Sequence, residues 1–192
     1  MMAANPIPKI TAEKYLEMER LAPFKSEFVG GEVFAMSGGL PAHGQLILQV
    51  GQELNEALED GPCVVTVTEV RLQVAADMYV YPDVMVVCGE FAVVDGHRDV
   101  ITNPSVVVEV LSESTERWDR GGKFAGYKRV ESLQEYLLVS QDAMRVEWFT
   151  RRDDGSWLYR EAAGPEGVVR LEKLGVSLAL GRLYRKVRGV TG

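Results

Sequence analysis

The feature that most constrains the fold is a short run of β-branched residues that carries one charge. Residues 105–111 read Ser-Val-Val-Val-Glu-Val-Leu and follow Asn103-Pro104, a pattern typical of a central β-strand. Glu109 stands inside this run, and a buried carboxylate is costly unless it is paired or bound to a metal. The run therefore predicts a buried strand whose single carboxylate has a partner.

A second carboxylate interrupts another apolar segment in the same way. Residues 78–88 are almost continuously apolar except at Pro82-Asp83, which predicts a strand covered on both faces. On neighbouring strands, Asp83 and Glu109 would make an oxygen-rich site suited to Mg²⁺ or Mn²⁺. Two other interpretations stay open: Asp83 caps a turn after Pro82, or Glu109 lies on the exposed face of an edge strand.

Hydrophobic periodicity elsewhere predicts helices mixed with strands, and hence an α/β fold with a mixed sheet. Thr11 is expected to cap a short helix that turns Tyr15, Leu16 and Met18 inward, and Gly30-Gly31 to join a tight hairpin. Further helices are expected over 41–59 and 119–130, the second capped by Asp119. Further strands are expected over 27–29, 32–36, 64–74, 135–139, 145–150 and 157–161.

Length and charge limit the organisation and the partners of the chain. Its 192 residues predict a single domain over 1–192, with a core at about 11–151 and a C-terminal hairpin and solubilising tail over 152–192. The net charge of −7 argues against a protein that coats nucleic acid through global attraction. Any phosphate contact then needs a metal or a local basic patch. One cluster of cations could form such a patch, or it could simply be a solvated helix face. It comprises Arg117, Arg120, Lys123, Lys128 and Arg129.

Cysteine usage and the first residues bear on the compartment. Cys63 and Cys88 each lie within an apolar run and are expected to be reduced, small hydrophobic residues. Residues 1–10 show neither a basic region nor an apolar core of a secretory signal, and no stretch resembles a membrane span. These features predict a cytoplasmic protein.

Several stretches together resemble the PD-(D/E)XK nuclease superfamily and, more narrowly, its Uma-type family of restriction-endonuclease-like proteins. The similarity runs from about Thr11 to Arg151, and the order and spacing of the stretches carry it. They are Glu27-Phe28-Val29-Gly30-Gly31-Glu32, His43, Tyr81-Pro82-Asp83-Val84, Val107-Val108-Glu109-Val110-Leu111-Ser112 with Ser114-Thr115, Asp119 with Lys123 and Tyr127, and Glu135-Tyr136.

The resemblance implies a restriction-endonuclease-like core, a mixed β-sheet flanked by helices with an N-terminal helix and hairpin. It implies Mg²⁺-dependent (or Mn²⁺-dependent) hydrolysis of DNA phosphodiester bonds, leaving a 5′-phosphate and a 3′-hydroxyl. Asp83 and Glu109 would then bind the metal, which acidifies a bound water. A lysine would stabilise the charge that develops on phosphorus. Such folds commonly pair to address two strands, so a homodimer is expected.

The sequence departs from the superfamily pattern at one position. Two residues after Glu109, where the motif places lysine, stands Leu111, which carries no charge. Lys123 is the best substitute, because its helix follows the Glu109 strand and because the Uma-type family shows the same rearrangement. The other interpretation is a solvated helix lysine.

Four further residues match positions of the family. Tyr127 lies one turn after Lys123 and faces the same side, although such a residue is more often core. Glu32 could add an acidic oxygen and His43 could orient a phosphate or water, or both could be solvated. Asp119 is expected to act as the helix cap.

Two rival functions stay open. One is a nuclease fold kept without turnover, as a binding or scaffold module, since Leu111 removes the usual lysine. The other is a metal-dependent phosphoesterase acting on RNA or nucleotides. A Lys123 ammonium within a few ångströms of the Asp83 and Glu109 carboxylates would favour the enzyme, whereas a lysine that faces solvent would favour the scaffold.

Overall fold

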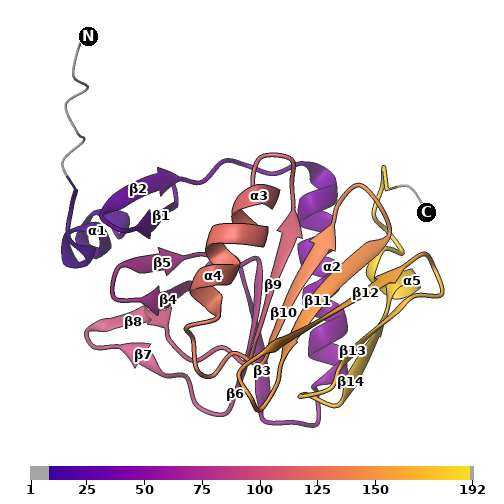
Figure 1. Cartoon of the computed structure of the whole chain (residues 1–192). Coiled ribbons are helices and arrows are strands. Elements are labelled where there is room, and N and C mark those ends of the chain that lie inside the picture. The colour runs from indigo at the N-terminus through magenta and orange to yellow at the C-terminus, as the bar shows by residue number, and fades with distance from the viewer. Residues whose placement is uncertain (1–8, 191–192) are drawn as a thin grey trace.

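The computed structural model describes residues 9–190, in which strands form two six-stranded sheets and a small hairpin (Figure 1). The strand order of the first sheet, called here the N-terminal sheet, is β2 (Glu32–Ala35), β1 (Ser26–Val29), β5 (Met78–Val80), β4 (Arg71–Ala75), β8 (His97–Ile101) and β7 (Val93–Val94). The order of the second, the central sheet, is β12 (Trp157–Ala163), β11 (Arg145–Arg151), β10 (Glu135–Ser140), β9 (Val106–Leu111), β6 (Val84–Cys88) and β3 (Cys63–Val67). The hairpin is β13 (Val168–Leu171) and β14 (Val176–Ala179).

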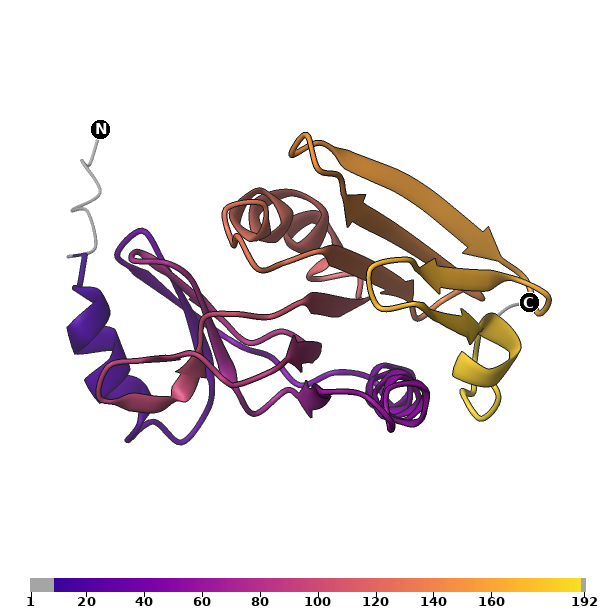
Figure 2. The ribbon, with the colours of Figure 1, turned by 90° about the horizontal axis from the view of Figure 1, so that it is seen from below.

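Helices cover the central sheet on both faces, as Figure 2 shows. One face packs on α2 (Pro41–Ala57). The other packs on a continuous helical segment that comprises α3 (Glu116–Trp118), a π-helical turn η1 (Asp119–Lys123) and α4 (Phe124–Tyr127). The predicted mixed sheet flanked by helices is therefore confirmed.

The central position of β9 follows from its valines, as predicted. It pairs parallel with β10 and antiparallel with β6, and all six of its residues are buried. Val106, Val108 and Val110 belong to the apolar core beneath α2, whereas Val107 and Leu111 belong to the core beneath the α3–α4 segment. Because side chains alternate along a strand, Glu109 faces the α3–α4 segment.

The N-terminal helix and hairpin form as predicted. Thr11 caps α1 (Ala12–Glu19) by accepting a hydrogen bond from the Lys14 amide, and Tyr15 and Leu16 are buried. Met18, expected to turn inward, is half exposed. Gly30 and Gly31 join β1 to β2 with φ values of 57° and 92°, which glycine adopts without strain.

Two segments predicted as single strands are each split between the sheets. The chain leaves β3 of the central sheet at Thr68, whose φ is 34°, and enters β4 of the N-terminal sheet. It returns from β5 to β6 through Tyr81-Pro82-Asp83. The predictions of one strand over 64–74 and one strand over 78–88 were therefore wrong, and Asp83, expected to interrupt the second, lies where the chain crosses between the sheets.

The helix predicted to begin at Asp119 begins earlier and ends earlier. It starts after Thr115 and its last regular residue is Tyr127. Asp119 is the first residue of the π-helical turn and is buried, so the prediction that it caps the helix was wrong.

The prediction of two reduced cysteines was also wrong. Cys63 on β3 lies directly opposite Cys88 on β6, and the two form a disulfide. Adjacent antiparallel strands bring the sulfur atoms together, which apolar runs taken separately do not reveal. Cysteine usage therefore gives no support to a reducing compartment.

The C-terminal region packs more firmly than predicted. Leu180 and Leu183 of α5 (Leu180–Leu183) and the following Tyr184 are buried against the core that contains α2. Arg182 pairs with Glu53 at 2.7 Å instead of forming part of a frayed tail.

No helix within residues 9–190 is long and apolar enough to cross a membrane. Residues 1–8, on which the prediction of no secretory signal mainly rests, lie outside the described residues.

Candidate active site

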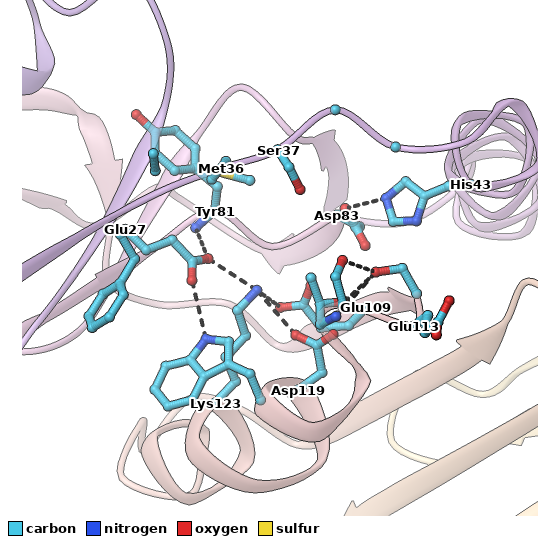
Figure 3. Close-up of a pocket in the computed structure, with 18 of the residues that line it drawn as sticks. Glu27, Met36, Ser37, His43, Tyr81, Asp83, Glu109, Glu113, Asp119 and Lys123 are labelled. Atoms are coloured by element: carbon cyan, nitrogen blue, oxygen red, sulfur yellow. Dashed lines mark hydrogen bonds and ion pairs between the residues drawn. The ribbon is translucent and has the colours of Figure 1, made fainter.

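A cleft of about 1280 Å³ opens where the two sheets meet (Figure 3). One wall comes from β1, β2 and the segment 36–40 that leads into α2. The other wall comes from the end of β9 and from the α3 and η1 helical turns. Asp83, Glu109 and Lys123 all line this cleft, so the fold brings together the three side chains singled out in the sequence.

Asp83 is fixed by the strand beside it. It directly precedes β6, next to the Val84–Val108 pair, and its Oδ2 accepts a hydrogen bond of 2.7 Å from the Val110 amide of β9. Its Oδ1 lies 3.4 Å from Nε2 of His43. The carboxylate thus ties β6 to β9 and does not cap a turn after Pro82.

Glu109 is 2% exposed and lies on a central strand, not on an edge. Its Oε1 accepts hydrogen bonds from the Tyr127 hydroxyl at 2.6 Å and from the Lys123 ammonium at 3.1 Å. Burial raises the pKa of Glu109 well above its ordinary value, although the charge of Lys123 opposes this effect. Glu109 therefore has partners, yet they do not offset its burial.

Lys123 is 5% exposed and contacts three carboxylates. Its Nζ lies 3.1 Å from Glu27, 3.1 Å from Glu109 and 3.4 Å from Asp119 (Figure 3). Burial alone would lower the pKa of the ammonium, but these carboxylates outweigh burial and raise it. Lys123 is thus a buried, charged group and not a solvated helix lysine.

Two further candidates lie at different depths in the cleft. His43 lies in the first turn of α2, and its hydrogen bond to Asp83 raises the pKa of the imidazole. Glu32 is exposed on the edge strand β2, where it lines the cleft but has no ion-pair partner among residues 9–190. The structure thus joins His43 to the Asp83 end of the site and leaves Glu32 at its mouth.

Glu27 is the site residue that sequence reasoning missed. It is buried on β1, and besides Lys123 it contacts the indole nitrogen of Trp118 at 3.2 Å. Two signals were available: Glu27 begins one of the stretches that resemble the Uma-type family, and it is a charge within a short predicted strand. In the sequence this charge looks like the solvated start of a hairpin.

The basic cluster expected around the helix is engaged inside the protein only in part. Lys123 is buried, and Arg120 forms a two-pronged ion pair with Glu147 at 2.7 and 2.8 Å. The Lys128 ammonium lies 4.3 Å from the centre of the Phe124 ring. Lys123 and Arg120 are therefore held by carboxylates of the protein, whereas Arg117, Lys128 and Arg129 remain exposed.

Carboxylates outnumber cations at the buried end of the cleft. Four carboxylates meet there, whereas the cations among the described residues at this end are Lys123 and, when protonated, His43. Burial also raises the pKa of Asp119. A further cation at this end would favour the ionised forms of Glu109 and Asp119. The carboxylates are Glu27, Asp83, Glu109 and Asp119.

Comparison with known proteins assigns the chain to a family. Residues 12–181 match the model of Uma2, which is described as "Putative restriction endonuclease". The chain belongs to the Uma2 family. Two proteins of Synechocystis sp., both described as uncharacterized, are similar to this Uma2 chain. One is 34% identical, with 94% of each chain covered, and the other is 36% identical, with 85% of this chain and 93% of the relative covered.

A solved structure has the same fold as this Uma2 chain. It is a protein of Anabaena variabilis described as a "putative nuclease belonging to DUF820", with a TM-score of 0.72 and 16% sequence identity. The match covers 92% of this chain and 98% of that one. The family and the fold therefore agree with the resemblance found in the sequence.

Proposed function

We propose that this protein is a divalent-metal-dependent endonuclease that hydrolyses DNA phosphodiester bonds, with Asp83 and Glu109 as metal ligands and Lys123 as a fixed positive charge. The observation that carries the proposal is the meeting of these three buried side chains in one cleft, with the Lys123 ammonium 3.1 Å from Glu109. The family description and the nuclease described for the Anabaena structure support it.

The residues present fit a hard divalent cation such as Mg²⁺ or Mn²⁺. Within residues 9–190 no three His, Cys, Asp or Glu side chains form a ready-made metal cage. Mg²⁺, however, usually binds through one or two carboxylates and keeps several waters, which Asp83 and Glu109 suit. The excess of carboxylates over cations in the cleft also favours such an ion. When bound, it would supply positive charge that polarises a phosphate and acidifies water.

The side chains of the protein have distinct tasks in this proposal. The Val110 amide orients Asp83, and the Tyr127 hydroxyl orients Glu109. Lys123 stays protonated among its carboxylates, so it acts as a positive charge and hydrogen-bond donor toward a phosphate and not as a base. His43 holds the second oxygen of Asp83.

The position of Lys123 favours an enzyme over a binding module that has lost turnover. A module of that kind has no need to bury an ammonium group, which is costly without close partners. Here the ammonium is buried and points at the carboxylates of the cleft (Figure 3). Leu111 therefore does not leave the cationic role vacant.

The test is cleavage of supercoiled plasmid, single-stranded DNA and RNA in Mg²⁺, Mn²⁺ or EDTA. Asp83→Asn and Lys123→Met should each lower the rate by roughly 100-fold or more, the first because it removes a charged metal ligand and the second because it removes a positive charge toward the phosphate. Glu59→Gln, which removes an exposed carboxylate outside the cleft, serves as the matched control. Cleavage that persists in EDTA or in both variants would refute the proposal, and cleavage of RNA alone would shift the substrate.

We also propose that two copies act together on duplex DNA, because a two-fold symmetric pair presents one site to each strand. β2 is the unpaired edge of the N-terminal sheet and exposes Val33 and Phe34, which suits contact with a second copy. Light scattering after size exclusion should give the mass of a dimer. A monomeric mass under conditions of double-strand cleavage would contradict this proposal.

A further inference from the structure

Glu27 is the carboxylate that the proposed mechanism leaves without a task. It lies on β1 of the N-terminal sheet, whereas Asp83 and Glu109 adjoin strands of the central sheet. We propose that Glu27 is a positioning residue that holds the Lys123 ammonium in the cleft, and that it is not a metal ligand. This inference rests on the proposed function.

Both oxygens of Glu27 already accept hydrogen bonds from groups of the protein. Oε1 lies 3.1 Å from Nζ of Lys123 and accepts a hydrogen bond of 3.3 Å from the Tyr81 amide. Oε2 accepts one of 3.2 Å from Nε1 of Trp118. These three donors take most of the roughly four lone-pair sites of the Glu27 carboxylate, whereas two donors, the Val110 amide and His43, face Asp83. The environment of Glu27 suits the fixing of a cation.

Of the three carboxylates around Lys123, Glu27 alone belongs to the N-terminal sheet. Asp119 precedes Lys123 by one turn of the same helical segment, so it moves with the lysine. Glu109 is assigned to the metal in the proposed mechanism, and binding an ion competes with its contact to Lys123. Glu27 therefore sets the position of the ammonium relative to the rest of the cleft.

The surroundings of Glu27 are themselves held in place. Glu19 accepts hydrogen bonds from the Ser26 amide at 2.8 Å and from the Tyr81 hydroxyl at 3.1 Å, which fixes the backbone beside Glu27. On the other side, the Trp118 ring lies against Gly122, where an added Cβ would stand 1.7 Å from the indole ring. Gly122 thus lets Trp118 reach Glu27, and it offers a way to disturb Glu27 without touching it.

The experiment compares the full-length wild type with Glu27→Gln, Gly122→Ala and the control Glu59→Gln. Single-turnover plasmid cleavage gives the rate, electron paramagnetic resonance gives the Mn²⁺ affinity, and mass mapping after treatment with an amine reagent gives the protection of Lys123. In Glu27→Gln, the amide places a donor against the existing donors, so the rate should fall about 10- to 100-fold. Lys123 should be modified several-fold faster, while the Mn²⁺ affinity changes by less than about twofold.

Gly122→Ala should give a smaller loss of rate, again with unchanged Mn²⁺ affinity, because it displaces only the Trp118 donor. Combining it with Glu27→Gln should cost no more than Glu27→Gln alone, since both act through one contact. This non-additivity distinguishes positioning from a general loss of stability.

Three results would overturn the inference. A drop of more than about tenfold in Mn²⁺ affinity would make Glu27 a ligand. An unchanged rate together with unchanged protection of Lys123 would leave Glu27 without a positioning role, and additive losses would separate it from Gly122. If the wild type cleaves no DNA, the proposed function fails, and the Lys123 protection and Mn²⁺ affinity still decide the role of Glu27.

Discussion

Glu135 offers a quantitative test of the electrostatics of the central sheet, away from the cleft. Its side chain is fully buried at the start of β10. Oε1 accepts weak hydrogen bonds of 3.3 Å from Thr150 and 3.5 Å from the Lys173 amide, and Oε2 has no hydrogen-bond partner among residues 9–190. Burial raises the pKa of Glu135 from 4.5 to about 7.

The raised pKa predicts how stability changes with pH. Below pH 4.5 the carboxyl is protonated in both the folded and unfolded states. As the pH rises to about 7, the unfolded chain releases its proton first, so the folded state loses stability. A difference of about 2.5 pH units corresponds to roughly 3 kcal/mol. Glu135→Gln, which cannot ionise, should therefore gain about 3 kcal/mol over the wild type between pH 4 and pH 8.

Urea unfolding at several pH values measures this difference directly. The free energy of unfolding of Glu135→Gln minus that of the wild type should rise steadily between pH 4.5 and 7 and then level off. Glu59→Gln removes an exposed carboxylate and should show a nearly constant difference. A Glu135→Gln difference that varies by less than about 0.5 kcal/mol over this range would refute the reasoning from burial.

Three further predictions test the packing and the covalent structure. Thiol titration of the denatured protein should find neither Cys63 nor Cys88 free, and reduction should cost about 3 kcal/mol in urea unfolding, the value expected for a bond that spans 25 residues. Arg120→Met leaves the buried Glu147 without its two-pronged partner and should lower the free energy of unfolding by about 1–3 kcal/mol. Leu54→Ala opens a cavity under α2, where Leu54 is fully buried, and should cost about 2–5 kcal/mol.

Features carried by local sequence could be predicted well. The valines of residues 105–111 were sufficient to identify the central strand, and Gly30-Gly31 to identify the first hairpin. The charge of Glu109 within those valines pointed to a buried site with partners, and the structure supplies Lys123 and Tyr127. In each case the cause lies in residues that are adjacent in the chain.

Features that depend on distant contacts could not be predicted. The alternation over 64–74 continues through Thr68, so a period of two residues does not reveal that the chain changes sheets there. Cys63 and Cys88 meet only because β3 and β6 pair. Glu27 becomes part of the cleft through its ion pair with Lys123, which lies on a helical segment far along the chain.

Asp119 was misjudged for a related reason. Aspartate is favoured at helix N-termini, where its side chain accepts backbone hydrogen bonds. Here the helix begins after Thr115, and the Asp119 carboxylate lies 3.4 Å from Lys123, one turn later. A propensity describes the average behaviour of a residue type, whereas this aspartate is placed beside the ammonium of Lys123.

The position of Lys123 shows how a cation can reach the same face of a sheet from two places in a sequence. On β9, Val107, Glu109 and Leu111 alternate with residues that face α2, so all three point toward the α3–α4 segment. A lysine at 111 would approach the carboxylates from within the sheet, whereas Lys123 approaches Glu109 from the helical segment that covers the same face. Leu111 is then free to join the apolar core under that segment, where it is buried. In the proposed site the positive charge comes from a different element but from the same side of the sheet, so Leu111 does not leave Glu109 without a cation.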